Sequence, residues 1–377
     1  MLDPTKKESR RGFLKRIGAA SAAVIAGGGL VRVLADTQTR PFEFLVVGDS
    51  LIWGQGLAES EKFYSLTADW LRREAFSKPR EVNLTVNAHS GSTLKFHADE
   101  AEKYRRIGRD ETYEFKPEVN VGFPSIWKQI EVASDNYSKV GKSGADLIMM
   151  TGGITDITVA KLLDPFGDIK KLPPMIEKHL HHDVFDVIEH AAKLHPNAVI
   201  AVVGYYPIIS PRTSRSRMFN GWLESMSFPR ILKPLANNPL TRKVYFNGIG
   251  RKATARSRVW ISESNRCMKA AVDKLNAKFT TPRAVFIESP ITEETCLETP
   301  NTLLFRIHNN GAVDDPLYAS RKAQCREALP KLKKETKIDY PVRLCEIAAV
   351  GHPNPAGSIA YAAAITAKLR SFPFGTI

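Results

Sequence analysis

Five short apolar runs, each closed by a turn and separated from the next by a helical pattern, constrain the fold of this 377-residue chain most strongly. Short apolar runs that end at glycine or polar residues are typical of buried strands. The intervening segments carry apolar residues at helical spacing, as Phe63, Leu66 and Trp70 do. We expect strands at 44–47, 82–86, 146–151, 198–203 and 284–288, and helices at 63–76, 125–137, 174–194, 262–279 and 356–370.

This alternation predicts βαβ units, and hence an α/β fold built on a parallel sheet with helices on both faces. Five such strands favour a doubly wound, flavodoxin-like arrangement. The stretches 95–124, 210–260 and 292–348 are rich in proline, asparagine and arginine and are too long for ordinary connections. We interpret them as long loop insertions near the site, within a single domain that spans 36–377.

The first 35 residues read as an export signal. Ser9-Arg10-Arg11-Gly12-Phe13-Leu14-Lys15 precedes an alanine- and glycine-rich run over 17–31, which is short and weakly apolar for a membrane span. The segment resembles a twin-arginine (Tat) signal peptide, which implies the Tat export machinery as a partner and a periplasmic or secreted location. We therefore exclude 1–35 from the fold. An uncleaved membrane anchor is the alternative.

The net charge is +14, and the first 35 residues carry seven of the basic residues and two of the acidic ones, so a surplus of nine remains on the rest. Such a surplus favours peripheral contact with anionic envelope surfaces. The chain has no zinc-finger spacing, no aromatic RNA-binding pattern and no basic heptad, so we expect no nucleic acid among its partners.

Four cysteines lie in the last third of the chain, and an exported protein can form disulfides from them. Of the three possible pairings we favour Cys325 with Cys345, because both flank a segment that leads into His352. Four free, partly buried thiols are the alternative.

The strand ends deliver the residues that carry chemistry. Ser50 follows the first strand, Gly91 follows the second, and His352 opens the last helix. Ligands bind at the carboxyl ends of the strands in open α/β sheets. Acyl transfer needs a nucleophilic oxygen, a base within reach and donors aimed at the developing oxyanion. Ser50 can be the nucleophile and His352 the base, with the backbone N–H groups of Ser50 and Gly91 as the donors.

The order of these blocks resembles the GDSL, or SGNH, hydrolase family of esterases and lipases. Gly48-Asp49-Ser50-Leu51 is similar to the nucleophile block of that family, Gly91 to its glycine block, and His352-Pro353-Asn354 to its histidine block. The resemblance implies an exported serine esterase or lipase that forms an acyl-enzyme on Ser50, with His352 as general base. It also implies a small-molecule, lipid or glycan ester as substrate, and no metal or organic cofactor.

The chain departs from the family pattern at two positions. Thr155, in Gly153-Ile154-Thr155-Asp156, stands where the family has an oxyanion-hole asparagine, and its hydroxyl is the candidate third donor, with the hydroxyls of Ser92 and Thr93 as alternatives. Losing one such donor costs about 10²- to 10³-fold in rate. Ala349 stands where the family has the acid of a triad. Glu346 or Asp315 could supply that acid, or a backbone carbonyl could orient the histidine in a dyad.

These departures keep two other functions open. A non-catalytic exported protein could use the same fold to bind an ester or glycan, and an acyltransferase could modify envelope glycans or lipids. We expect no metal site, because His179 and His182 share a helix face but have no third ligand at compatible spacing.

Three further residues have plainer interpretations. Asp156 is expected to be structural and to bond turn amides. Tyr205 and Tyr206 follow the fourth strand, where they either wall a pocket or pack in the core.

Overall fold

The computed structural model describes residues 40–112, 124–219, 238–240, 243, 246–308, 310–337 and 339–372. The predicted signal at 1–35 and parts of the insertions 95–124 and 210–260 lie outside the described residues. The chain from Pro41 onward forms one unit. Among the described helices, none has the length and apolar character needed to cross a membrane.

Five parallel strands form a single sheet in the order β2-β1-β3-β4-β5. This is the flavodoxin-like order of doubly wound proteins, so the predicted fold class is confirmed. Leu45 of β1 pairs with Thr85 of β2 on one side and with Ile148 of β3 on the other. The strands are β1 (Phe42–Val47), β2 (Val82–Val86), β3 (Leu147–Met150), β4 (Val199–Val203) and β5 (Ala284–Ile287).

Strands β1, β3 and β4 are buried along their whole length, as their near-continuous apolar sequences require of strands covered on both faces. Strand β1 begins two residues before the expected start and includes the acidic Glu43, which is buried. Its carboxylate is paired with Lys142 at 2.6 Å and accepts a hydrogen bond from Asn83 at 2.8 Å.

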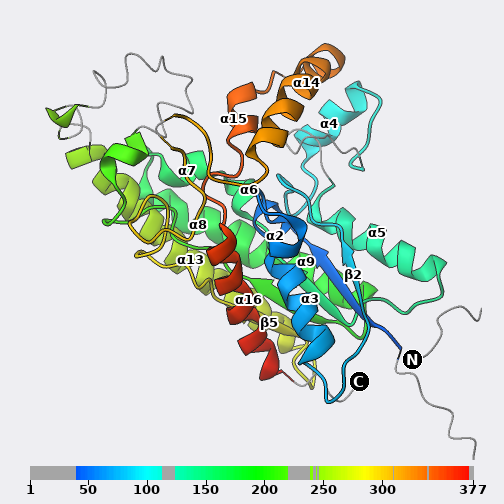
Figure 1. The fold of residues 1–377 in the computed structure, drawn as a ribbon. Helices are drawn as coiled ribbons and strands as arrows, with labels where there is room; N and C mark the ends of the chain where they lie inside the picture. The colour runs from blue at the N-terminus through cyan, green and yellow to red at the C-terminus, as the bar shows by residue number, and fades with distance from the viewer. Residues whose placement is uncertain are drawn as a thin grey trace, which may run out of the picture. The chain divides into compact units, whose positions relative to one another are not determined.

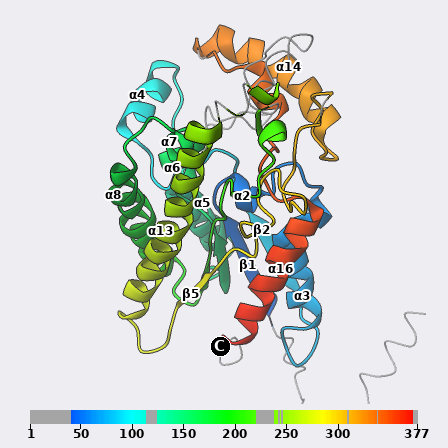
Figure 2. The ribbon, with the colours of Figure 1, turned by 90° about the vertical axis from the view of Figure 1, so that its left-hand side faces the viewer.

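Helices cover both faces of the sheet, as Figures 1 and 2 show. Helices α3 (Phe63–Arg73) and α16 (Pro355–Arg370) lie on one face. Helices α5 (Ile126–Lys139), α9 (Val184–Leu194) and α13 (Arg251–Asn276) lie on the other. The helix expected over 262–279 is thus the second half of a longer one.

The helix expected over 174–194 is divided into three segments. Its first part is α8 (Leu172–Glu177), its middle is the π-helical turn η3 (Lys178–Asp183), and its last part is α9. Short elements complete the fold: α2 (Ser50–Trp53), η1 (Glu59–Glu61), α6 (Ile154–Ile157), α7 (Val159–Leu163), η2 (Ile169–Lys171) and η5 (Phe246–Gly250).

The insertions contain more helix than expected. Helix α4 (Ala98–Arg106) lies in the first of them, while α14 (Tyr318–Thr336) and α15 (Val342–Glu346) lie in the third. All three stand over the carboxyl edge of the sheet (Figure 1). Alanine, lysine, arginine and glutamine are good helix formers and supply much of α14. The helix continues through Pro330.

A disulfide joins Cys325 of α14 to Cys345 of α15, with 5.9 Å between their Cα atoms. This is the pairing that the sequence favoured. Cys267 and Cys296 are buried free thiols. The disulfide therefore fixes the two insertion helices to each other just upstream of His352.

Candidate active site

Strand β1 ends in a turn that presents Ser50 at the carboxyl edge. Gly48 has a φ of 142°, and a Cβ at this position would lie 2.6 Å from the carbonyl oxygen of Thr151. Only glycine fits such a conformation and so close an approach. Asp49 then caps α2 by accepting a hydrogen bond from the N–H of Leu51 at 3.1 Å. Ser50 is the first residue of that helix and is partly exposed.

Gln129 of α5 fixes this turn by hydrogen bonds. Its Oε1 accepts the N–H of Gly48 at 2.7 Å, and its Nε2 donates to the carbonyl of Gly48 at 3.2 Å and to Oγ of Ser92 at 2.9 Å. The buried amide thus ties the nucleophile turn to the turn that contains Gly91. Sequence reasoning missed this residue. The sequence feature that could have indicated this role is a glutamine on the apolar face of a helix, between Ile126 and Ile130.

Asp49 connects the ends of three strands. Its Oδ1 accepts a hydrogen bond from Thr151 Oγ1 at 2.6 Å, and its Oδ2 accepts one from the hydroxyl of Tyr205 at 2.5 Å. The same Tyr205 hydroxyl accepts the N–H of Ile154 at 3.2 Å. Burial raises the pKa of Asp49 above its usual value, although these hydrogen bonds oppose the shift. Tyr205, which the sequence left between pocket and core, is a buried partner of Asp49.

His352 reaches the nucleophile from the far end of the chain. Its carbonyl accepts the N–H of Phe305 at 2.8 Å, and Asn354 caps α16 just beyond it. The imidazole Nε2 lies 2.7 Å from Oγ of Ser50. The structure therefore brings the predicted nucleophile and the predicted base into hydrogen-bond contact, across 302 residues of sequence.

The other ring nitrogen of His352 is buried and has no hydrogen-bond partner within the described part of the chain. Burial lowers the pKa of His352 to about 4, and the positive charge of Arg321 adds to the shift. The backbone carbonyls of Ala349 and Ala348 raise the pKa of His352, which partly offsets the effect of burial. Neither carbonyl meets the geometric criteria for a hydrogen bond with Nδ1. The imidazole is therefore neutral at pH 7 and can accept a proton.

The structure brings neither proposed triad acid to His352. Asp315 accepts two hydrogen bonds from Arg321, at 3.0 and 2.5 Å. Glu346 pairs with Arg326 at 2.8 Å and with Arg343 at 3.1 Å. A buried carboxylate is stabilised by a nearby guanidinium. The pair of Glu346 with Arg326 joins α15 to α14, whereas Asp315 precedes α14 and pairs with an arginine of that helix. The expectation that either one orients the imidazole is not met.

The predicted oxyanion donors lie on the two neighbouring strand ends. Gly91 has a φ of 87°, in a turn fixed by the bond between Gln129 and Ser92 and by a bond from the N–H of His89 to the carbonyl of Gly48 at 3.0 Å. Thr155 lies in α6, is partly exposed, and makes no side-chain hydrogen bond to any described residue. Its role as the third donor stays a prediction.

Asp156 stabilises the segment that follows Gly91. Its carboxylate accepts the N–H of Leu94 at 3.1 Å and lies 3.1 Å from Nε2 of His97. This hydrogen bond is the main reason that the pKa of His97 is raised. The sequence predicted a structural acceptor of turn amides, and the amide that Asp156 accepts comes from a different segment of the chain.

The histidines on the helix beside α13 group differently from the sequence expectation. His179 turns to Asp183, 2.9 Å away, whereas Glu177, His181 and His182 bring their ligand atoms within 4.8 Å of one another. The candidate group is therefore a different set from the pair of His179 and His182 that the sequence singled out. However, Arg266 lies 3.7 Å from the Glu177 carboxylate, and Lys274 carries a further positive charge near His181, whose pKa is lowered by burial and then by the charges of His182 and Lys274. Both cations oppose the binding of a metal ion, so we assign none.

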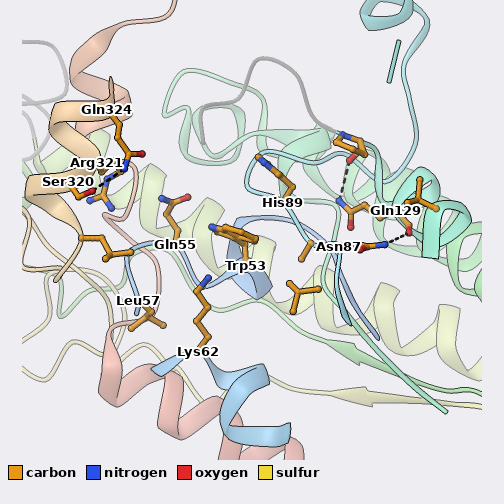
Figure 3. Close-up of a pocket in the computed structure, with 17 residues that line it drawn as sticks. Trp53, Gln55, Leu57, Lys62, Asn87, His89, Gln129, Ser320, Arg321 and Gln324 are labelled. Atoms are coloured by element: carbon orange, nitrogen blue, oxygen red, sulfur yellow. Dashed lines mark hydrogen bonds between the residues drawn. The ribbon is translucent and has the colours of Figure 1, made fainter. Parts of the chain in front are cut away.

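A cavity of about 580 Å³ opens beside α2, between that helix, the end of β2 and α14 (Figure 3). Trp53, Gln55, Lys62 and His89 line it, and neither Ser50 nor His352 does. The ring of Trp53 stacks on that of His89 with centroids 5.7 Å apart. The cavity therefore adjoins the Ser50–His352 pair without containing it.

No protein-family model matches this chain, and no curated protein matches its sequence. Among solved structures, an extracellular lipase from Streptomyces rimosus is similar at 12% identity and a TM-score of 0.46, covering 87% of this chain and 99% of that one. A phospholipase A1 from Streptomyces albidoflavus matches at 10% identity and 0.42, with the same coverage. An aryl esterase from M. smegmatis matches at 11% identity and 0.35, covering 88% and 99%. Similarity this low carries no argument about activity, which rests on the geometry above.

Proposed function

We propose that this protein is a serine ester hydrolase of the GDSL/SGNH type. The observation that carries the proposal is the 2.7 Å contact between Nε2 of His352 and Oγ of Ser50 at the carboxyl edge of a parallel sheet. A serine hydroxyl becomes nucleophilic when an adjacent base can take its proton. The neutral imidazole that burial favours is such a base at pH 7.

In the proposed reaction, Ser50 Oγ attacks the ester carbonyl while His352 Nε2 takes its proton. The backbone N–H groups of Ser50 and Gly91, with the hydroxyl of Thr155, stabilise the oxyanion of the tetrahedral intermediate. The imidazolium then protonates the leaving alcohol, and an acyl group remains on Ser50. Water, deprotonated by His352, attacks this acyl-enzyme and releases the acid. The chain's own residues supply every proton transfer.

The base works as part of a dyad rather than a triad. In a triad the acid orients the imidazole and stabilises its charged form. Here main-chain contacts fix the backbone at His352, through the bond from Phe305 N–H to its carbonyl and through the cap of α16, and the imidazole itself contacts Ser50. No described carboxylate hydrogen-bonds the imidazolium, so we expect slower turnover than a complete triad gives.

Export completes the proposal. The Tat-like segment at 1–35 supports a periplasmic or secreted enzyme that passes through the Tat machinery. The disulfide between Cys325 and Cys345 suits an oxidising compartment. The surplus of positive charge supports contact with anionic envelope surfaces, where lipid or glycan esters occur.

The test uses two readouts of the serine. Purified 36–377 is expected to hydrolyse short 4-nitrophenyl esters and to be labelled by a fluorophosphonate at Ser50. Ser50→Ala should abolish both, whereas Ser138→Ala, at an exposed serine on α5, should change neither. Equal labelling and turnover of the wild type and Ser50→Ala would refute the proposal.

One observation favours a second function, a non-catalytic protein that binds an ester or glycan. The unpaired Nδ1 of His352 leaves the base without the support that efficient catalysis uses. Ligand binding that survives Ser50→Ala, with no turnover across an ester panel and no fluorophosphonate labelling, would select this function over hydrolysis.

A further inference from the structure

The cavity beside α2 shares its walls with the turns that carry the candidate active site. It begins at Trp53, the last residue of the one-turn helix that Ser50 opens. It extends to His89, two residues before Gly91, and is closed on its other side by Arg321 and Gln324 of α14 (Figure 3). A molecule held in this cavity therefore lies beside the turns that carry Ser50 and Gly91.

The cavity is electropositive. Lys62, His89 and Arg321 contribute basic side chains, while no aspartate or glutamate is found among the described residues that line it. The charge of Arg321 is already neutralised by the carboxylate of Asp315, which accepts two hydrogen bonds from it. Lys62 is therefore the cation that a ligand would meet.

The ammonium group of Lys62 is buried with little compensation. Its side chain is 7% exposed, and its carboxylate partner in the described chain, Glu59 at 3.1 Å, is 66% exposed. An ion pair with so exposed a partner is weak. The ammonium also lies 4.1 Å from the centroid of the Trp53 ring and 5.6 Å from that of the Tyr64 ring, and neither cation–π contact gives its N–H groups a hydrogen-bond acceptor. A buried ammonium is costly unless an anion accepts from it.

Gln55 provides a second polar group in the cavity. The residue is 5% exposed, and its Oε1 is buried without a hydrogen-bond partner among the described residues. Figure 3 shows its amide pointing into the cavity between Trp53 and Arg321. Buried amides are normally hydrogen-bonded. A half-turn of the amide exchanges its oxygen for an NH₂ donor, which can then serve the same ligand as Lys62.

We infer that this cavity binds an anionic oxygen group, a carboxylate or a phosphate, carried by the ester substrate. The buried ammonium supplies the charge, Gln55 supplies a neutral donor, and the missing acidic lining removes the repulsion that would oppose an anion. The assignment of the ligand as a substrate rests on the proposed esterase activity, whereas the anion site itself does not depend on Ser50.

The experiment compares esters that differ by one charge. On the acyl side, mono-4-nitrophenyl glutarate is matched with 4-nitrophenyl valerate. On the alcohol side, 4-acetoxybenzoate is matched with phenyl acetate. Rates are taken above those of Ser50→Ala. We expect a higher kcat/KM for the anionic member of at least one pair. Lys62→Gln should remove roughly 10- to 100-fold of that value through KM, the range for a hydrogen bond to a charged group, and leave the neutral esters within about twofold.

Two further variants make the result specific. Gln55→Leu should also lower the preference for the anionic ester, and it carries the test if Lys62→Gln does not fold. Lys333→Gln removes an equal charge from an exposed position on α14 that pairs with Asp339, and it should change neither member of a pair. Inhibition of neutral-ester turnover by inorganic phosphate or by glutarate distinguishes a phosphate site from a carboxylate site.

The outcomes separate the two proposals. The anion site is overturned if neutral esters are hydrolysed, neither pair shows a preference for its anionic member, and neither anion inhibits in a Lys62-dependent way. In that case the proposed esterase function still holds. Binding of phosphate or glutarate, measured by calorimetry and lost in Lys62→Gln, supports the anion site even if no ester is turned over, in which case the proposed esterase function fails.

Discussion

The nucleophile and the base of the candidate site are supported in opposite ways. Around Ser50, buried polar side chains saturate the turn, since Asp49 and Gln129 each make several hydrogen bonds to groups on other elements. Around His352, the main chain supplies the support, and the imidazole Nδ1 has no hydrogen-bond partner among the described residues. A preorganised nucleophile therefore faces a weakly supported base, which locates the limit on the rate at the histidine.

His352→Ala tests the base directly and should have the largest effect. Positioned acid–base groups contribute about 10²- to 10⁴-fold to rate, so we expect kcat on a 4-nitrophenyl ester to fall by that range. The melting temperature should fall only slightly, because His352 is partly buried and the truncation removes little packing, so the loss of rate is not a loss of folding. His308→Ala, at an exposed histidine, is the control. A loss smaller than tenfold would mean that another group activates Ser50.

Gln129→Leu breaks the support on the nucleophile side. The variant keeps the side-chain size but leaves the N–H of Gly48 buried without its acceptor. We expect it to lower the free energy of unfolding by about 2–4 kcal/mol, since leaving one buried group unsatisfied costs about 1–3 kcal/mol and Gln129 serves more than one. Chemical denaturation measures this. An unchanged midpoint would show that the turn is held by other contacts.

Asp49→Asn also tests the support around Ser50, with a smaller expected loss in the free energy of unfolding. The new amide faces the hydroxyl of Tyr205, which already accepts from Ile154 and needs an acceptor for its own proton. We expect a loss of about 1–3 kcal/mol in the free energy of unfolding. Combining Asp49→Asn with Tyr205→Phe should cost less than the sum of the two single variants, because the new amide then no longer faces a tyrosine hydroxyl that needs an acceptor. Strict additivity would contradict the shared network.

The sequence predicted what depends on short-range pattern and chain order. Apolar runs located the strands, and the carboxyl-edge rule brought Ser50 and His352 to one place across 302 residues. It could not assign partners to buried carboxylates. Asp315 and Glu346 lie near His352 in sequence, yet arginines on α14 and α15 hold them, and that choice depends on how two insertion helices pack.

Other features escaped prediction for related reasons. Gln129 looked like one polar residue on a helix, because its function appears only when α5 packs under the turn at Gly48. The region 292–348 looked like a loop because its proline and polar content hid the helix-forming composition of α14. The cavity beside α2 combines Lys62 with residues of α14 more than 250 positions away, which no local pattern reveals.

The pH dependence of kcat/KM on a neutral ester tests the central claim most directly. His352 acts as a base only when deprotonated, and burial lowers its pKa to about 4 without a carboxylate to raise it. Activity should therefore stay constant as the pH falls from 8 to about 5 and decline only as the pH approaches 4. A decline with a midpoint between about 6 and 7, the range of an ordinary histidine, would contradict a dyad with a desolvated, unpaired imidazole.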